Sequence, residues 1–136
     1  MSRLGIFGYQ LLTGISDFST GAMLIIAPAL TLRLMHLDAP PITLVYVSFI
    51  GAFVLSVGLA CLYGALLAYR KVGRTKLEVV WLLTAFTRAA VAVFIVAQVM
   101  GNALEAGWAM VAIFDGVCVV IQAMGLRKGW LACVAR

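Results

Sequence analysis

Long apolar runs separated by short polar segments make up most of the sequence. Four of these runs, if helical, are long enough to cross about 30 Å of hydrocarbon; they are Leu4–Leu32, Ile42–Tyr69, Leu77–Gly101 and Gly107–Leu126. None alternates apolar and polar positions as a membrane β-barrel strand does. Because backbone groups in lipid must be hydrogen-bonded within the protein, the runs predict transmembrane helices. We expect one all-α domain, an antiparallel four-helix membrane bundle.

Polar side chains recur at helical spacing in three of the four runs. Steps of three, four or seven residues place them on one face of each helix, with Ile95 as the intermediate position between Arg88 and Gln98 in the third run. The members are Gln10, Thr13, Asp17 and Thr20 in the first run, Thr84, Arg88 and Gln98 in the third, and Asp115 and Gln122 in the fourth. Polar groups are costly in lipid, so the three stripes are predicted to face the interior of the bundle.

The second run has no charge between Thr43 and Tyr69 and carries small residues instead. Gly51, Gly58 and Gly64 are examples, and their spacings are typical of membrane helices whose backbones approach closely. We interpret them as packing positions. In the first run, Pro28 is expected to kink the outer end of the helix. The segment after it is expected to follow the outer interface until Pro40 and Pro41 start the next helix.

Most basic residues lie near the two chain ends and in the loop between the second and third runs, which an antiparallel bundle places on the same side. They are Arg3, Arg70, Lys71, Arg74, Lys76, Arg127, Lys128 and Arg136, whereas the other side has Arg33 with Asp38 and Glu105. The positive-inside rule therefore places both termini and the middle loop in the cytoplasm. The net charge of +5 reflects this topology and does not indicate nucleic-acid binding, since 65% of the residues are hydrophobic. Contact of the middle loop with anionic lipid or an acidic partner is a further hypothesis.

Asp17, Arg88 and Asp115 lie at similar depth when residues are counted from the helix ends. One ionised residue at a helix centre costs roughly 2.5–3.5 kcal/mol, so the three are expected to pair. We predict that Arg88 faces inward between the two aspartates, because its guanidinium fork can bind two carboxylates. Two acids against one cation leave a surplus, and Asp17 is the candidate to hold a proton.

Two interpretations of this charge cluster remain open. In the first, it is structural and fixes the register and orientation of the helices. In the second, it is a site for a proton, an ion or a small polar ligand. The supporting polar face would be Gln10, Thr13, Thr20, Thr84, Gln98 and Gln122.

Residue patterns for other chemistry are not found in the sequence. The cysteines Cys61, Cys118 and Cys133 are widely separated, and His36 is the only histidine. Neither a metal site nor a redox pair of thiols is therefore expected. No glycine loop for phosphate and no nucleophile with its base is present. We expect no cofactor, and a self-sufficient enzyme is not favoured.

Two stretches resemble the DoxX-like group of small bacterial membrane proteins. They are LTGISDFSTGAMLIIAPALTLRLMHL at residues 12–37 and FDGVCVVIQAMGL at residues 114–126. The resemblance implies a four-helix protein of the bacterial inner membrane and, for some members, an accessory role beside respiratory or sulfur-redox enzymes. It implies no catalytic residue. Small multidrug transporters are also similar in size and in the acid of the first helix, but they lack an arginine corresponding to Arg88.

Two functions follow as hypotheses. The first is a non-catalytic membrane protein that supports a larger membrane complex or binds a lipid-like ligand such as a quinone. Its partners would be the bilayer and either another protein or further copies of the chain. The alternative is a small proton- or ion-coupled transporter that uses the charge cluster, with Asp17 as the titrating group.

Overall fold

The computed structural model describes residues 2–37, 43–71 and 73–134. All regular structure in these residues is helical, as the sequence predicted. The α-helices are α1 (Arg3–Ile26), α2 (Pro28–Leu34), α3 (Leu44–Arg70), α4 (Arg74–Met100) and α5 (Ala109–Arg127). Two short 3-10 helices, η2 (Ala106–Trp108) and η3 (Trp130–Val134), precede and follow α5.

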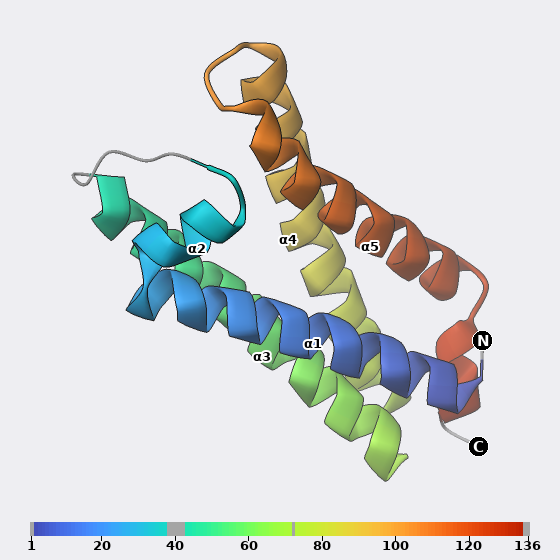
Figure 1. Cartoon of the computed structure of the whole chain (residues 1–136). Helices are drawn as coiled ribbons and strands as arrows, with labels where there is room; N and C mark the ends of the chain where they lie inside the picture. Colours follow the sequence, from blue (N-terminus) through green and yellow to red (C-terminus); the bar gives the residue numbers. More distant parts are fainter. Residues whose placement is uncertain (1, 38–42, 72, 135–136) are drawn as a thin grey trace.

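The long helices form two pairs, α1 with α3 and α4 with α5 (Figure 1). In the first pair Gly14 faces Leu62 while Gly21 faces Leu55, so residue numbers rise on one helix as they fall on the other. The two helices are therefore antiparallel. Between the pairs, α3 touches α4 only sparingly.

The second pair is also antiparallel, because Thr84 bonds Gln122 and Arg88 bonds Asp115. Across the pairs, Arg88 of α4 also bonds Asp17 of α1. The rings of Tyr9 and Trp81 also meet, so residue numbers rise together on α1 and α4. The chain direction of α1 therefore matches that of α4, which is the arrangement expected of alternate helices in an antiparallel set.

Glycines bring the backbones of α1 and α3 into direct contact. A Cβ atom added to Gly21 would lie 2.7 Å from the carbonyl oxygen of Gly51, and one added to Gly58 would lie 2.9 Å from Cα of Phe18. Only hydrogen fits at these positions without a shift of the opposite helix. The small residues of the second apolar run are thus the surface on which α1 packs.

An apolar cluster closes the end of the molecule where both termini lie (Figure 1). Ile6 of α1, Leu77 and Trp81 of α4, and Leu131 and Val134 of η3 are buried there. The helix η3 is not among the predicted elements, since the last predicted run ends at Leu126. Its two buried side chains, Leu131 and Val134, are three positions apart and both belong to the cluster.

The predicted helix Leu4–Leu32 is in fact two helices. The chain leaves the helical conformation at Ala27, which has φ −140° and ψ 62°, and Pro28 starts α2. Proline has no N–H for a helical bond, and its ring clashes with the preceding turn. The expected kink is therefore a complete break. Pro40 and Pro41 lie outside the described residues.

The other helices begin and end within a few residues of their predicted bounds. The run expected at Leu77–Gly101 is helical from Arg74 to Met100, one turn earlier at its start. The run expected at Gly107–Leu126 starts its α-helix at Ala109 because the preceding residues adopt the tighter 3-10 geometry.

Three helical stretches of the described chain are long and apolar enough to cross a membrane: α3, α4 and Ala106–Arg127. Many large apolar side chains on them face outward, which suggests a membrane protein. The fourth predicted span, in α1, is not among the three. Gln10, Asp17 and the hydroxyl groups around them make α1 less apolar.

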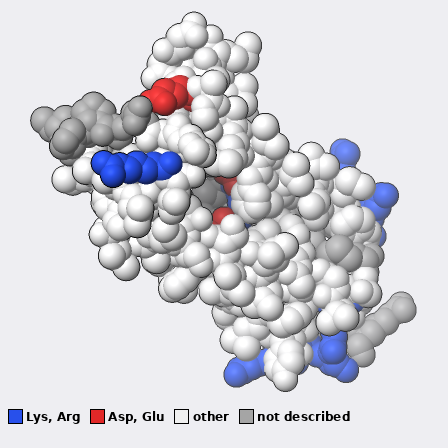
Figure 2. Space-filling model, viewed as in Figure 1, with Lys and Arg blue, Asp and Glu red and all other residues white. Residues whose placement is uncertain are grey.

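Charged side chains lie mainly at the ends of the helices (Figure 2). The end that carries both termini also carries the basic connection between α3 and α4. Its described basic residues are Arg3, Arg70, Lys71, Arg74, Lys76, Arg127 and Lys128. Arg33 and Glu105 lie toward the other end, so the asymmetry expected from the sequence is present in the fold.

We expect Gly58→Ala to destabilise the protein. Alanine favours a helix over glycine by up to about 1 kcal/mol, but overpacking against Phe18 costs about 1–3 kcal/mol. The midpoint of thermal unfolding in mild detergent should therefore fall. Gly116→Ala is the matched control, since nothing lies within 4 Å of its added Cβ. An equal response of both variants would contradict the packing role of Gly58.

Candidate functional site

A buried arginine joins three helices at the centre of the molecule. Arg88 of α4 donates from Nη1 to Oδ1 of Asp115 on α5, at 2.5 Å, and from Nη2 to Oδ2 of Asp17 on α1. Its guanidinium carbon also lies 5.4 Å from the ring centre of Phe114. The structure thus places Arg88 between the two aspartates, and we call these three residues the charge cluster.

Helical spacing explains why the three side chains meet. On α1 the buried positions include Gln10, Thr13 and Asp17, which follow one another in steps of three and four. On α5 they include Asp115 and Gln122, one step of seven apart. Each helix therefore turns one narrow polar face inward.

The charge cluster is buried unevenly. The side chain of Arg88 is 3% exposed, whereas those of Asp17 and Asp115 are 10% and 11% exposed. Figure 2 shows acidic atoms at the base of a hollow between the two halves of the molecule. If all three groups are ionised, the cluster carries one net negative charge. The arrangement can therefore neutralise a cation or hold one proton.

A second polar contact ties α4 to α5 beside the charge cluster. Thr84 donates its hydroxyl to the carbonyl of Val80 at 2.7 Å and accepts from Nε2 of Gln122 at 2.7 Å. On α1, Thr13 donates to the carbonyl of Tyr9 at 2.9 Å, so its hydroxyl is satisfied within its own helix.

Several fully buried polar atoms have no hydrogen-bond partner among the described residues. They are Nε2 and Oε1 of Gln10, Nε1 of Trp81, Nε of Arg88 and Oε1 of Gln122. Leaving such a group unsatisfied costs about 1–3 kcal/mol, more when the group is charged. These atoms are hydrogen-bond donors and acceptors that a small polar ligand could satisfy.

Trp81 and Tyr9 belong to this region, although the sequence analysis did not select them. Their ring centres are 5.4 Å apart, and Trp81 is completely buried against Gly125 of α5. The spacing could have shown this, because Trp81 lies three residues before Thr84 and seven before Arg88, on the same helical face.

Two residues of the predicted polar face take no part in these contacts. Thr20 and Gln98 are only half-buried, and neither side chain makes a hydrogen bond within the described residues. In residues 2–37, 43–71 and 73–134, no three histidine, cysteine or acidic side chains gather around a possible metal position.

Removal of the Arg88 charge alone should lower the stability of the protein more than removal of all three charges of the cluster. Arg88→Met leaves two carboxylates buried side by side, so we expect a loss of about 3–5 kcal/mol in the free energy of unfolding. The triple variant Asp17→Asn, Arg88→Met, Asp115→Asn has no charge to compensate and should recover most of that loss. Unfolding in a graded detergent mixture measures both. A triple variant as unstable as Arg88→Met would contradict this account.

Arg88→Lys tests whether the forked shape of the guanidinium group is needed in addition to its positive charge. A lysine ammonium is a single point charge on a flexible chain and cannot present two parallel donor pairs to two carboxylates. We expect its stability to lie between those of the wild type and Arg88→Met, measured in the same way. Stability equal to the wild type would show that positive charge alone is sufficient.

No protein-family model matches this chain, nor does any curated protein or any solved structure. The resemblance of residues 12–37 and 114–126 to DoxX-like proteins therefore stays a prediction from short motifs. The charge cluster is assigned from the geometry of this chain alone.

Proposed function

We propose that the chain is a multi-pass protein of the bacterial inner membrane and a non-catalytic subunit of a larger membrane complex. The distribution of polarity carries the proposal. The buried charged groups are paired with one another inside the protein. On the outside, large apolar side chains such as Phe49, Phe53 and Phe94 are between 59% and 63% exposed. Such a surface requires lipid or a protein partner to cover it.

Membrane insertion would use four spans, with α1 as the fourth. The polar face of α1 is covered by the other helices, and its outer face carries exposed Leu12, Ile15 and Ile26. A helix of 24 residues is about 36 Å long, enough to cross the hydrocarbon. The gathering of basic residues at one end supports cytoplasmic termini.

Binding of a lipid-like ligand such as a quinone is the other form of this non-catalytic role. A quinone carbonyl accepts hydrogen bonds, and the buried N–H groups of Trp81 and Gln10 are donors without partners. Trp81 belongs to the apolar cluster at the basic end, and Gln10 lies on α1 one turn beyond Ile6 of that cluster.

The subunit proposal is tested by purification from native membranes in mild detergent, followed by native mass spectrometry. We expect the 14.5 kDa chain to elute with at least one different polypeptide at fixed stoichiometry. Arg88→Met is the control for specificity, because loss of the correct fold should release the partner. A chain that elutes alone, or only with copies of itself, would refute the subunit role.

A proton- or ion-coupled transporter is the second candidate, supported by the surplus acid in the charge cluster. Both carboxylates keep some exposure, while the guanidinium between them is nearly enclosed. An ionisable group in this position can exchange a proton with the hollow. Asp17 would be the titrating group, since Asp115 lies on the helix that packs directly against α4.

Flux measurements on reconstituted vesicles separate the two candidates. A transporter gives proton-dependent flux that Asp17→Asn abolishes, whereas Glu78→Gln leaves it unchanged. Glu78 is the matched control because it lies at the exposed start of α4, paired with Arg74. Under the subunit proposal, the wild type gives no more flux than empty vesicles.

A further inference from the structure

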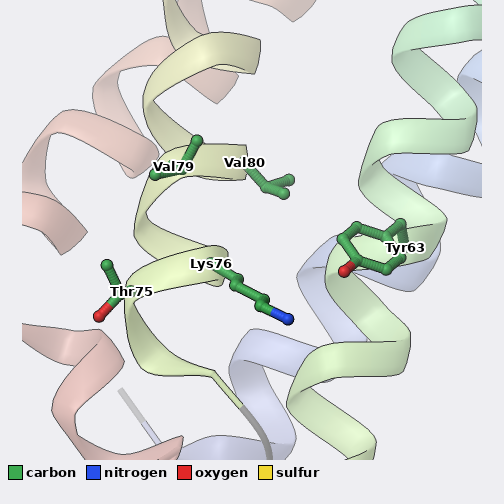
Figure 3. A pocket seen from close by; sticks show the side chains of 5 residues that line it. All are labelled: Tyr63, Thr75, Lys76, Val79 and Val80. Carbon is green, nitrogen blue, oxygen red and sulfur yellow. The ribbon is translucent and has the colours of Figure 1, made fainter.

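A groove between α3 and α4 lies beside the basic end of the molecule. Its volume is about 290 Å³, and it is lined by Tyr63 of α3 and by Thr75, Lys76, Val79 and Val80 of α4 (Figure 3). Most of its wall is apolar. It is separate from the charge cluster, since it shares no residue with it.

The groove exists because small residues of α3 face α1 and not α4. Gly51 and Gly58 pack against α1, so α3 turns the large side chain of Tyr63 toward α4. The two helices consequently touch sparingly, and Tyr63 and Val79 stay 47% and 49% exposed. An apolar gap of this kind within a membrane protein is open to the acyl chains around it.

One end of the groove carries a positive charge. The side chain of Lys76 extends from α4 across the gap toward Tyr63 (Figure 3). Arg74 is bound to Glu78 through a bond of 2.8 Å from Nε to Oε1. Lys76, by contrast, has no carboxylate partner among the described residues. Its ammonium group is therefore available to an anion from outside the chain.

The groove runs from the end of the helices toward their middle. Tyr63 is seven residues before Arg70, the last residue of α3, which is about 10 Å along the helix axis. Lys76 lies in the first turn of α4. With the basic end at the cytoplasmic interface, Lys76 is at the level of the lipid headgroups and Tyr63 is in the hydrocarbon.

We propose that this groove binds one anionic phospholipid of the cytoplasmic leaflet. The lipid phosphate accepts a charge-assisted hydrogen bond from the ammonium group of Lys76. One acyl chain lies over Val79, Val80 and the ring of Tyr63. The inference rests on the proposed membrane location and adds a ligand class to it.

Lipid competition tests the proposal. The protein is reconstituted in nanodiscs of phosphatidylglycerol and phosphatidylcholine in equal amounts, and retained lipid is counted by native mass spectrometry. We expect one phosphatidylglycerol to stay bound per chain. One lysine near anionic lipid accounts for about a fivefold preference, so Lys76→Gln should lower retention by about fivefold. Lys128→Gln removes the same charge at the same end, outside the groove, and should have no such effect.

A second variant fills the groove without changing charge. Val79→Trp occupies the acyl-chain surface from an already half-exposed position, so we expect it to reduce retained phosphatidylglycerol as Lys76→Gln does. Equal losses in Lys76→Gln and Lys128→Gln would show only general electrostatic attraction and overturn the proposal. Equal retention of phosphatidylcholine, or full retention in Val79→Trp, would overturn it as well.

Failure of this inference can be told apart from failure of the proposed function. Resistance of the wild-type protein to extraction from membranes by alkaline carbonate reports insertion alone. A protein that is inserted but shows no lipid selectivity lacks the proposed lipid site, while its membrane location stands. A protein that carbonate extracts contradicts the membrane proposal, and the lipid site with it.

Discussion

The ion pairs of Arg88 impose the main constraint on how the helices are arranged. A guanidinium removed from water is stable only beside compensating charge, and here the two carboxylates come from helices of different pairs. Satisfying both of them sets the rotation of α1, α4 and α5 about their axes and their relative depth. Together with the ring contact of Tyr9 and Trp81, the ion pair of Asp17 and Arg88 shows that α1 runs in the direction of α4.

The two helix pairs are held together by different forces. In α1 and α3 the contact is between backbones, with Gly21 and Gly58 allowing the approach, so the attraction is van der Waals packing. In α4 and α5 it is between side chains, through the bond from Gln122 to Thr84 and the ring of Trp81 on Gly125. The difference follows from composition, because α3 carries no polar stripe to bond with. It also explains why α3 and α4 leave a groove between them.

Much of this arrangement could be predicted from the order of residues. Apolar runs indicated the long helices, and the depth of Asp17, Arg88 and Asp115 along them was sufficient to expect that they would meet. The break at Ala27 could not be predicted, because whether a proline kinks or ends a membrane helix depends on the groups that take up the freed hydrogen bonds. Thr20 and Gln98 show a second limit. Helical spacing tells which face a residue occupies, but not how far along that face the neighbouring helix extends.

The two pairs of helices also carry a consequence for synthesis. The pair α1 and α3 is complete before α4 leaves the ribosome, yet its buried Asp17 has its counter-ion on α4. Under the proposed membrane location, the carboxyl group must during that interval enter the bilayer as a neutral acid or stay at its surface, since an unpaired charge costs several kcal/mol in the hydrocarbon. A chain interrupted after residue 71 would keep a well-packed helical hairpin with an uncompensated acid at its centre. Under the same proposal, the first half of the protein can assemble early, but its place in the membrane becomes stable only when α4 supplies the counter-ion.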